Sequence, residues 1–167
     1  MKTIISGDNK SKKNRLVGFL SIVCSVFSII MMGIWVLWFA FAFDMPSGYF
    51  DTIPPVQKMF SSTMGTTLIG SIIGALVAAL LLFIGGFAIM WKPNRQAISR
   101  VGAYVGLASG IGMLMVSCLS IPVSMTFLSM IDAFLRAAFL SIAPIIYLTF
   151  PILILILLRK SLAKANN

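Results

Sequence analysis

The sequence predicts an all-α integral membrane protein, a bundle of four transmembrane helices with both termini in the cytoplasm. Of the 167 residues, 59% are hydrophobic and only 10% are charged, whereas a soluble domain carries about 25% charged residues. Four apolar runs are each long enough to cross a hydrocarbon core of about 30 Å. The 13 basic residues outnumber the 4 acidic ones, and they flank the apolar runs, which favours a role in membrane orientation over nucleic-acid binding.

These patterns divide the chain into a basic cytoplasmic tail, a membrane domain and a second basic tail. The predicted segments are residues 1–15, 16–158 and 159–167, with transmembrane spans at about 16–43, 67–91, 101–121 and 137–158.

The first span, 16–43, contains no charged residue. A helix of that length extends about 42 Å, so we expect it to tilt or to project from the membrane. Ser21, Ser25 and Ser28 recur at helical spacing, which is typical of a helix-packing face.

The second and third spans are expected to form a hairpin. Pro55 in the preceding loop, 44–66, suits a first helical position. Lys92 and Pro93 end the second span, and Pro122 follows the third. Small residues recur in both spans, mostly four residues apart, and let helix backbones approach closely in a membrane. They are Gly70, Gly74, Ala78, Gly85 and Gly86 in the second span and Gly102, Gly106 and Gly110 in the third.

Matching depth across a hairpin centred on about Gln96 places Gly85 and Gly86 opposite Gly106. The small outer residues Gly70 to Ala79 then face bulkier positions on the third span. We therefore expect close hairpin contact in the cytoplasmic half only. The outer face is left for the first span, the fourth span or a helix of a partner protein.

Between the third and fourth spans, residues 123–136 predict a short helix at the outer interface. Ser129, Asp132 and Arg136 share one helical face, and the two charged residues form an i, i+4 pair of opposite sign. A segment that dips into the bilayer is the alternative, and it would make these residues candidates for function.

The fourth span, 137–158, has no charge and no glycine. Pro144 and Pro151 each remove a backbone donor and are expected to bend it. Tyr147 sits near its middle, where the hydroxyl needs a partner. With Asp132 and Arg136, it completes the set of candidate polar functional points.

The distribution of charge predicts the topology. Eleven basic residues lie in the two tails and the middle turn, whereas Lys58 and Arg136 lie on the other side with three of the four acidic residues. The positive-inside rule then predicts a multi-pass protein of the cell membrane, plasma or inner, with both termini cytoplasmic.

The sequence offers little catalytic machinery. It contains no histidine and no glutamate, which excludes His-activated nucleophiles and most zinc or haem sites. Cys24 and Cys118 fit no metal motif, and no span carries an acidic residue well inside it. We therefore expect no enzyme activity, no cofactor and no metal.

The function expected from these features is that of a non-catalytic accessory or scaffold subunit of a larger membrane complex. Its partners would be the lipid bilayer and another membrane protein, or further copies of the chain, packed through small-residue faces. A channel or transporter subunit, and a membrane immunity protein against a pore-forming toxin, remain alternatives.

Overall fold

The computed structural model is helical throughout the residues it describes, which are 2–42, 55–92, 96–125 and 129–163. Side chains are described for 15–39, 62–92, 96–125 and 129–159. The four helices are α1 (Lys2–Ala42), α2 (Pro55–Trp91), α3 (Ala97–Ser124) and α4 (Met130–Ala163). Each contains a stretch of 25 to 30 residues that is long and apolar enough to cross a membrane. The protein is therefore a four-helix, multi-pass membrane protein.

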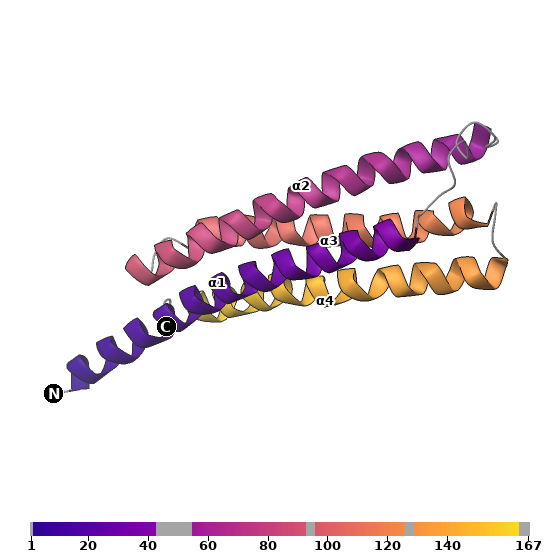
Figure 1. Cartoon of the computed structure of the whole chain (residues 1–167). Coiled ribbons are helices and arrows are strands. Elements are labelled where there is room, and N and C mark those ends of the chain that lie inside the picture. Colours follow the sequence, from indigo (N-terminus) through magenta and orange to yellow (C-terminus); the bar gives the residue numbers. More distant parts are fainter. Residues whose placement is uncertain (1, 43–54, 93–95, 126–128, 164–167) are drawn as a thin grey trace.

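The helices alternate in direction and lie side by side along the bundle (Figure 1). Helix α1 contacts α2 and α4, and α3 contacts the same two helices. Helix α1 begins and α4 ends at the same end of the bundle (Figure 1), which also holds Arg15, Lys92, Arg100 and Arg159. We call this end the basic end and the opposite one the distal end.

The helices extend beyond the apolar runs that predicted them. Residues 2–15, predicted as a tail, are helical and continue α1 past the bundle (Figure 1). Helix α2 begins at Pro55, the expected first position. Two hydroxyl groups near its start are hydrogen-bonded within the helix: those of Thr66 and Thr67 donate to the carbonyl of Thr63 at 3.0 and 2.7 Å.

The segment between α3 and α4 contains no separate helix among the residues described there. Helix α3 continues through Pro122 to Ser124, and residues 130–136 are the first turns of α4. Residues 126–128, and residues 44–54 of the predicted first loop, lie outside the described residues. The placement of 130–136 at a membrane interface stays a prediction.

Two clusters of buried side chains form the core. Near the basic end, Leu82 of α2 packs with Ile154 and Leu158 of α4 and with buried residues of α1 and α3. Toward the distal end, Trp35 of α1 packs with Met113 of α3 and Tyr147 of α4. The interior is thus closed by large apolar side chains in both halves.

Candidate functional site

The three polar residues predicted as functional points do not form one site. Asp132 is exposed in the first turn of α4, and Tyr147 follows it by about 22 Å along the same helix. Arg136, which lies between them in sequence, is half-buried. The structure therefore gives Asp132 and Tyr147 separate local roles.

Asp132 helps to start α4. Its backbone N–H donates to the hydroxyl of Ser129 at 3.2 Å, and that hydroxyl donates to the Asp132 carboxylate at 2.6 Å. This arrangement is a variant of the capping box, which satisfies donors at a helix N-terminus. A capping role accounts for the charge of Asp132 at this position without requiring a ligand.

Tyr147 is 1% exposed and lies in the distal core. Its hydroxyl lies over Gly106, where an added Cβ would be 3.5 Å from the oxygen and 3.4 Å from Cβ of Pro151. At Gly110 an added Cβ would collide with Leu148. Gly110 therefore allows Leu148 of α4 to pack closely on α3, a role the hairpin prediction did not include, whereas a Cβ at Gly106 would make only ordinary contacts.

The hairpin of α2 and α3 is closely packed over most of its length. A Cβ added at Gly85 would collide with Ser99, and one at Gly74 would collide with the hydroxyl of Ser109. At Gly102 an added Cβ would lie 2.9 Å from Cβ of Leu81 and 3.2 Å from the Ala78 carbonyl oxygen. The expectation of close contact in the cytoplasmic half alone is wrong.

The error lies in the register. Gly85 faces Ser99, not Gly106, and Gly86 faces α1. Trp91 lies six residues beyond Gly85, whereas α3 begins only two residues before Ser99. Helix α2 therefore projects farther at the basic end than α3 does (Figure 1). A hairpin centred on the turn pairs Gly85 with Gly106 instead of Ser99, which is an error of about two helical turns along α3.

Helix α1 covers much of the remaining small surface of α2. The backbones meet at Gly18 and Gly86, where a Cβ added to either residue would lie 2.7 Å from the carbonyl oxygen of the other. One turn farther, the Ser21 hydroxyl donates to the Leu82 carbonyl at 2.9 Å. The Ser25 hydroxyl then donates to the Ala79 carbonyl at 2.7 Å. The serine face was predicted, whereas Gly18 was missed.

This contact opens toward the distal end. The Ser28 hydroxyl is buried and has no hydrogen-bond partner within the described structure. Neither do the indole N–H of Trp35 and the hydroxyl of Ser124. Trp35 belongs to the distal core cluster, so this N–H lies among apolar side chains.

Three glycines serve no contact within the bundle. A Cβ added at Gly33 on α1, or at Gly65 or Gly70 on α2, would meet nothing within 4 Å. Gly70 is exposed together with Thr66 and Ser62, each four residues before the next. This small surface, which we call the α2 small face, lies in the distal half of α2 and points away from the other helices.

The two cysteines are free, with Cys24 buried and Cys118 exposed. The described residues contain no group of three or more side chains suited to hold a metal ion. Comparison of the chain with protein-family models, curated proteins and solved structures finds no match. A function must therefore be argued from the geometry.

Proposed function

We propose that the chain is a non-catalytic subunit of a larger membrane complex and that it binds a transmembrane helix of another protein on the α2 small face. The observation that carries the proposal is the open surface formed by Ser62, Thr66 and Gly70. By the positive-inside rule, the basic end lies in the cytoplasm of a plasma or inner membrane, and the α2 small face lies in the outer half of the bilayer.

A helix partner explains why these residues are small. Apolar side chains gain little from meeting one another instead of lipid, so helix association in membranes depends on close van der Waals packing. Small residues at four-residue spacing give that closeness. Elsewhere in this chain, Gly18, Gly74, Gly85 and Gly86 all serve close helix contacts, so an open glycine at Gly70 fits a contact made with another chain.

The polar groups of the α2 small face need no ligand. The hydroxyl of Thr66 donates to the carbonyls of Ser62 and Thr63 at 3.1 and 3.0 Å within the same helix. The hydroxyl at the centre of the surface is thus satisfied within its own helix, which suits a van der Waals contact better than a polar substrate.

A channel through a single copy is less well supported. The interior hydroxyls of Ser21 and Ser25 donate to backbone carbonyls, and Trp35 lies in the distal core at 0% exposure. A polar path along the bundle axis would have to displace these groups.

The experiment is co-purification in mild detergent from native membranes, with a photo-cross-linking residue at position 66. Wild type is expected to carry a partner and to cross-link to it. Gly70→Leu should lose both, because the new side chain occupies the contact but meets nothing in the chain's own fold. Ala138→Leu, at an exposed position in the distal part of α4, is the control and should retain the partner.

A lone monomer in wild type, with no cross-link, would refute the proposal. A cross-link between two copies of the chain would show that the α2 small face binds a second copy and not another protein. Ion flux in liposomes from the purified chain would favour the channel alternative.

A further inference from the structure

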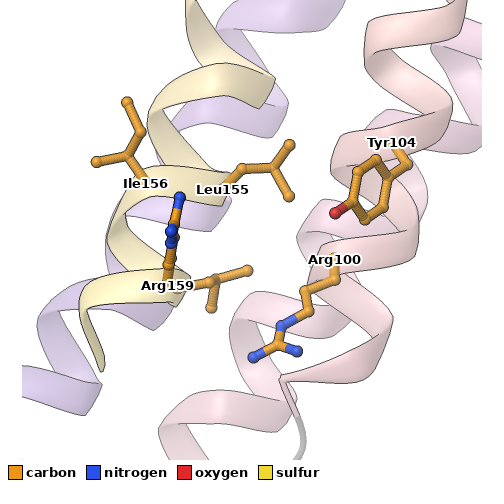
Figure 2. A pocket seen from close by; sticks show the side chains of 6 residues that line it. Arg100, Tyr104, Leu155, Ile156 and Arg159 are labelled. Atoms are coloured by element: carbon orange, nitrogen blue, oxygen red, sulfur yellow. The ribbon is translucent and has the colours of Figure 1, made fainter. Parts of the chain in front are cut away.

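A hollow of about 350 Å³ opens at the basic end between α3 and α4. This volume falls within the range of roughly 300–1,000 Å³ typical of ligand sites. Its lining residues come from both helices and are Arg100, Tyr104, Leu155, Ile156, Leu158 and Arg159 (Figure 2). None of them takes part in the α2 small face, so the hollow is independent of the proposed function.

The register of α3 and α4 brings the two arginines to the same depth. Farther along the bundle, Gly106 lies against Pro151. Continuing the antiparallel pairing toward the basic end sets Arg100 beside Leu158 and Arg159. In Figure 2, Arg100 extends from α3 toward α4, and Arg159 lies on the α4 side of the hollow. Two cations therefore share its rim.

No carboxylate within the described structure balances this charge. Among the residues with described side chains, Asp132 carries the carboxylate. It lies at the other end of α4, about 40 Å from Arg159. No salt bridge or side-chain hydrogen bond to a described residue occupies either guanidinium group. Two like charges at the mouth of one hollow attract an anion, and guanidinium groups bind phosphate in a bidentate geometry.

The deeper walls are apolar. Leu158 is 1% exposed, and Leu155 and Ile156 line the α4 side. Tyr104 lies one turn deeper than Arg100, where the charged rim gives way to these apolar groups, and its phenol points from α3 toward α4 (Figure 2). Tyrosine suits such a boundary, because its ring is apolar and its hydroxyl is polar.

We propose that this hollow binds the headgroup of one anionic phospholipid. Arg100 and Arg159 contact the phosphate, Tyr104 reaches the ester region, and an acyl chain lies against Leu155 and Ile156. A free phosphate ion would use the arginines but leave the apolar walls uncovered. A choline headgroup would bring a cation to two arginines with no described carboxylate to receive it, so an anionic lipid is the favoured occupant.

The experiment is native mass spectrometry of the full chain, delipidated in detergent and titrated with phosphatidylglycerol or with phosphatidylcholine of the same acyl chains. Wild type should retain one phosphatidylglycerol more tightly than phosphatidylcholine. Each of Arg100→Gln and Arg159→Gln should weaken retention about fivefold, and the double variant about twenty-five-fold, from about 1 kcal/mol per basic residue near an anionic headgroup.

The matched control is Arg15→Gln with Lys92→Gln, because both residues are exposed at the basic end and neither lines the hollow. It removes the same charge and should change retention less than twofold. Replacement of both arginines by lysine should recover part of the affinity, which shows that the glutamine variant lost charge and not its fold.

Three results would overturn the proposal. Equal retention of the two lipids would remove the role of the headgroup charge. An equal loss of phosphatidylglycerol retention in the Arg100/Arg159 and the Arg15/Lys92 double variants would mean that the overall charge of the basic end, and not the hollow, binds the lipid. Displacement of the lipid by millimolar inorganic phosphate would assign the hollow to free phosphate.

Discussion

The crossing of α1 and α2 at Gly18 and Gly86 offers a direct test of how the bundle is held together. Replacing either glycine by alanine adds one methyl group to a contact between two backbones. At Gly18 the new Cβ would lie 2.7 Å from the Gly86 carbonyl oxygen, and at Gly86 it would lie 2.7 Å from the Gly18 carbonyl oxygen. Backbone atoms cannot rotate away as a side chain can, so the helices must separate.

The size of the separation follows from the contact distances. Ordinary contact begins at 3.4 Å, so the helices must move apart by about 0.7 Å. The bond from Ser21 to the Leu82 carbonyl, now 2.9 Å, would lengthen to about 3.6 Å and be lost. Overpacking of this kind costs about 1–3 kcal/mol. Loss of the Ser21 hydrogen bond accounts for about 0.6 kcal/mol, which is the average contribution of an interhelical hydrogen bond in a membrane protein.

The assay is equilibrium unfolding in mixed micelles with an increasing fraction of sodium dodecyl sulfate, followed by tryptophan fluorescence. Of the three tryptophans, Trp35 is fully buried, whereas Trp38 is 40% and Trp91 is 92% exposed, so we expect the change in fluorescence on unfolding to come mainly from Trp35. Gly33→Ala and Gly70→Ala make the same chemical change where nothing lies within 4 Å, and we expect them to stay within about 0.5 kcal/mol of wild type.

The double variant Gly18→Ala with Gly86→Ala provides a second readout. Once one methyl group has separated the helices, the second has room, so the double variant should cost less than the sum of the two single variants. If all four single variants shift the free energy of unfolding equally, or if the double variant is additive, the close crossing does not limit stability and the reasoning fails.

Three further substitutions test single interactions. Ser25→Ala removes the donor to the Ala79 carbonyl and should cost about 0.6 kcal/mol in the same titration; no loss would mean that the bond is exchanged for another in the unfolded state. Trp35→Phe removes a buried N–H that has no partner within the described structure. It should cost under about 1.5 kcal/mol, against about 3–5 for Trp35→Ala, and equal losses would contradict this. Ser129→Ala removes the cap bonded to Asp132 and should speed amide exchange in the first turn of α4 by an amount equivalent to about 1 kcal/mol, leaving exchange at the basic end unchanged.

The four spans could be predicted because apolar length is a property of one segment. Their ends could not, because the features that extend a helix are local hydrogen bonds among polar residues. Helix α2 starts twelve residues before the predicted span at 67. Its Thr66 and Thr67 hydroxyls donate to carbonyls one turn back. Hydropathy counts these residues as polar, although in a helix their hydroxyl groups are satisfied.

The glycine pattern identified packing residues but not the helix that each one meets. Gly74 and Gly85 face α3, Gly86 faces α1, and Gly110 faces α4, although all share similar sequence surroundings. Neighbouring residues such as Gly85 and Gly86 lie about 100° apart around the helix axis, so the helix that each one meets depends on how the other helices are arranged around it. Gly18 shares its apolar run only with Gly33, which is too distant to form a small-residue pattern with it, and its importance is visible only beside Gly86.

The same limit applies to the arginines. Arg100 and Arg159 were each predictable as an anchor at the end of a span, since each follows or precedes an apolar run. Their shared hollow was not, because it depends on the register between α3 and α4. That register is visible only in the structure, where Pro151 lies against Gly106.

The two ends of the bundle differ in a way that joins both proposals. At the basic end, glycine contacts and serine hydrogen bonds draw α1 onto α2, and the arginines stand at a hollow beside α3 and α4. At the distal end Trp35 fills the core, and Gly33 and Gly70 are left open. The contacts of α2 with α1 at the basic end and with α3 along the hairpin fix the axis of α2, so its exposed distal face keeps a defined direction. A partner helix can then dock on a preformed surface, which lowers the entropy cost of association. On this view Gly18→Ala, although far from the α2 small face, should weaken partner binding as well as stability, whereas Gly70→Leu should weaken partner binding alone.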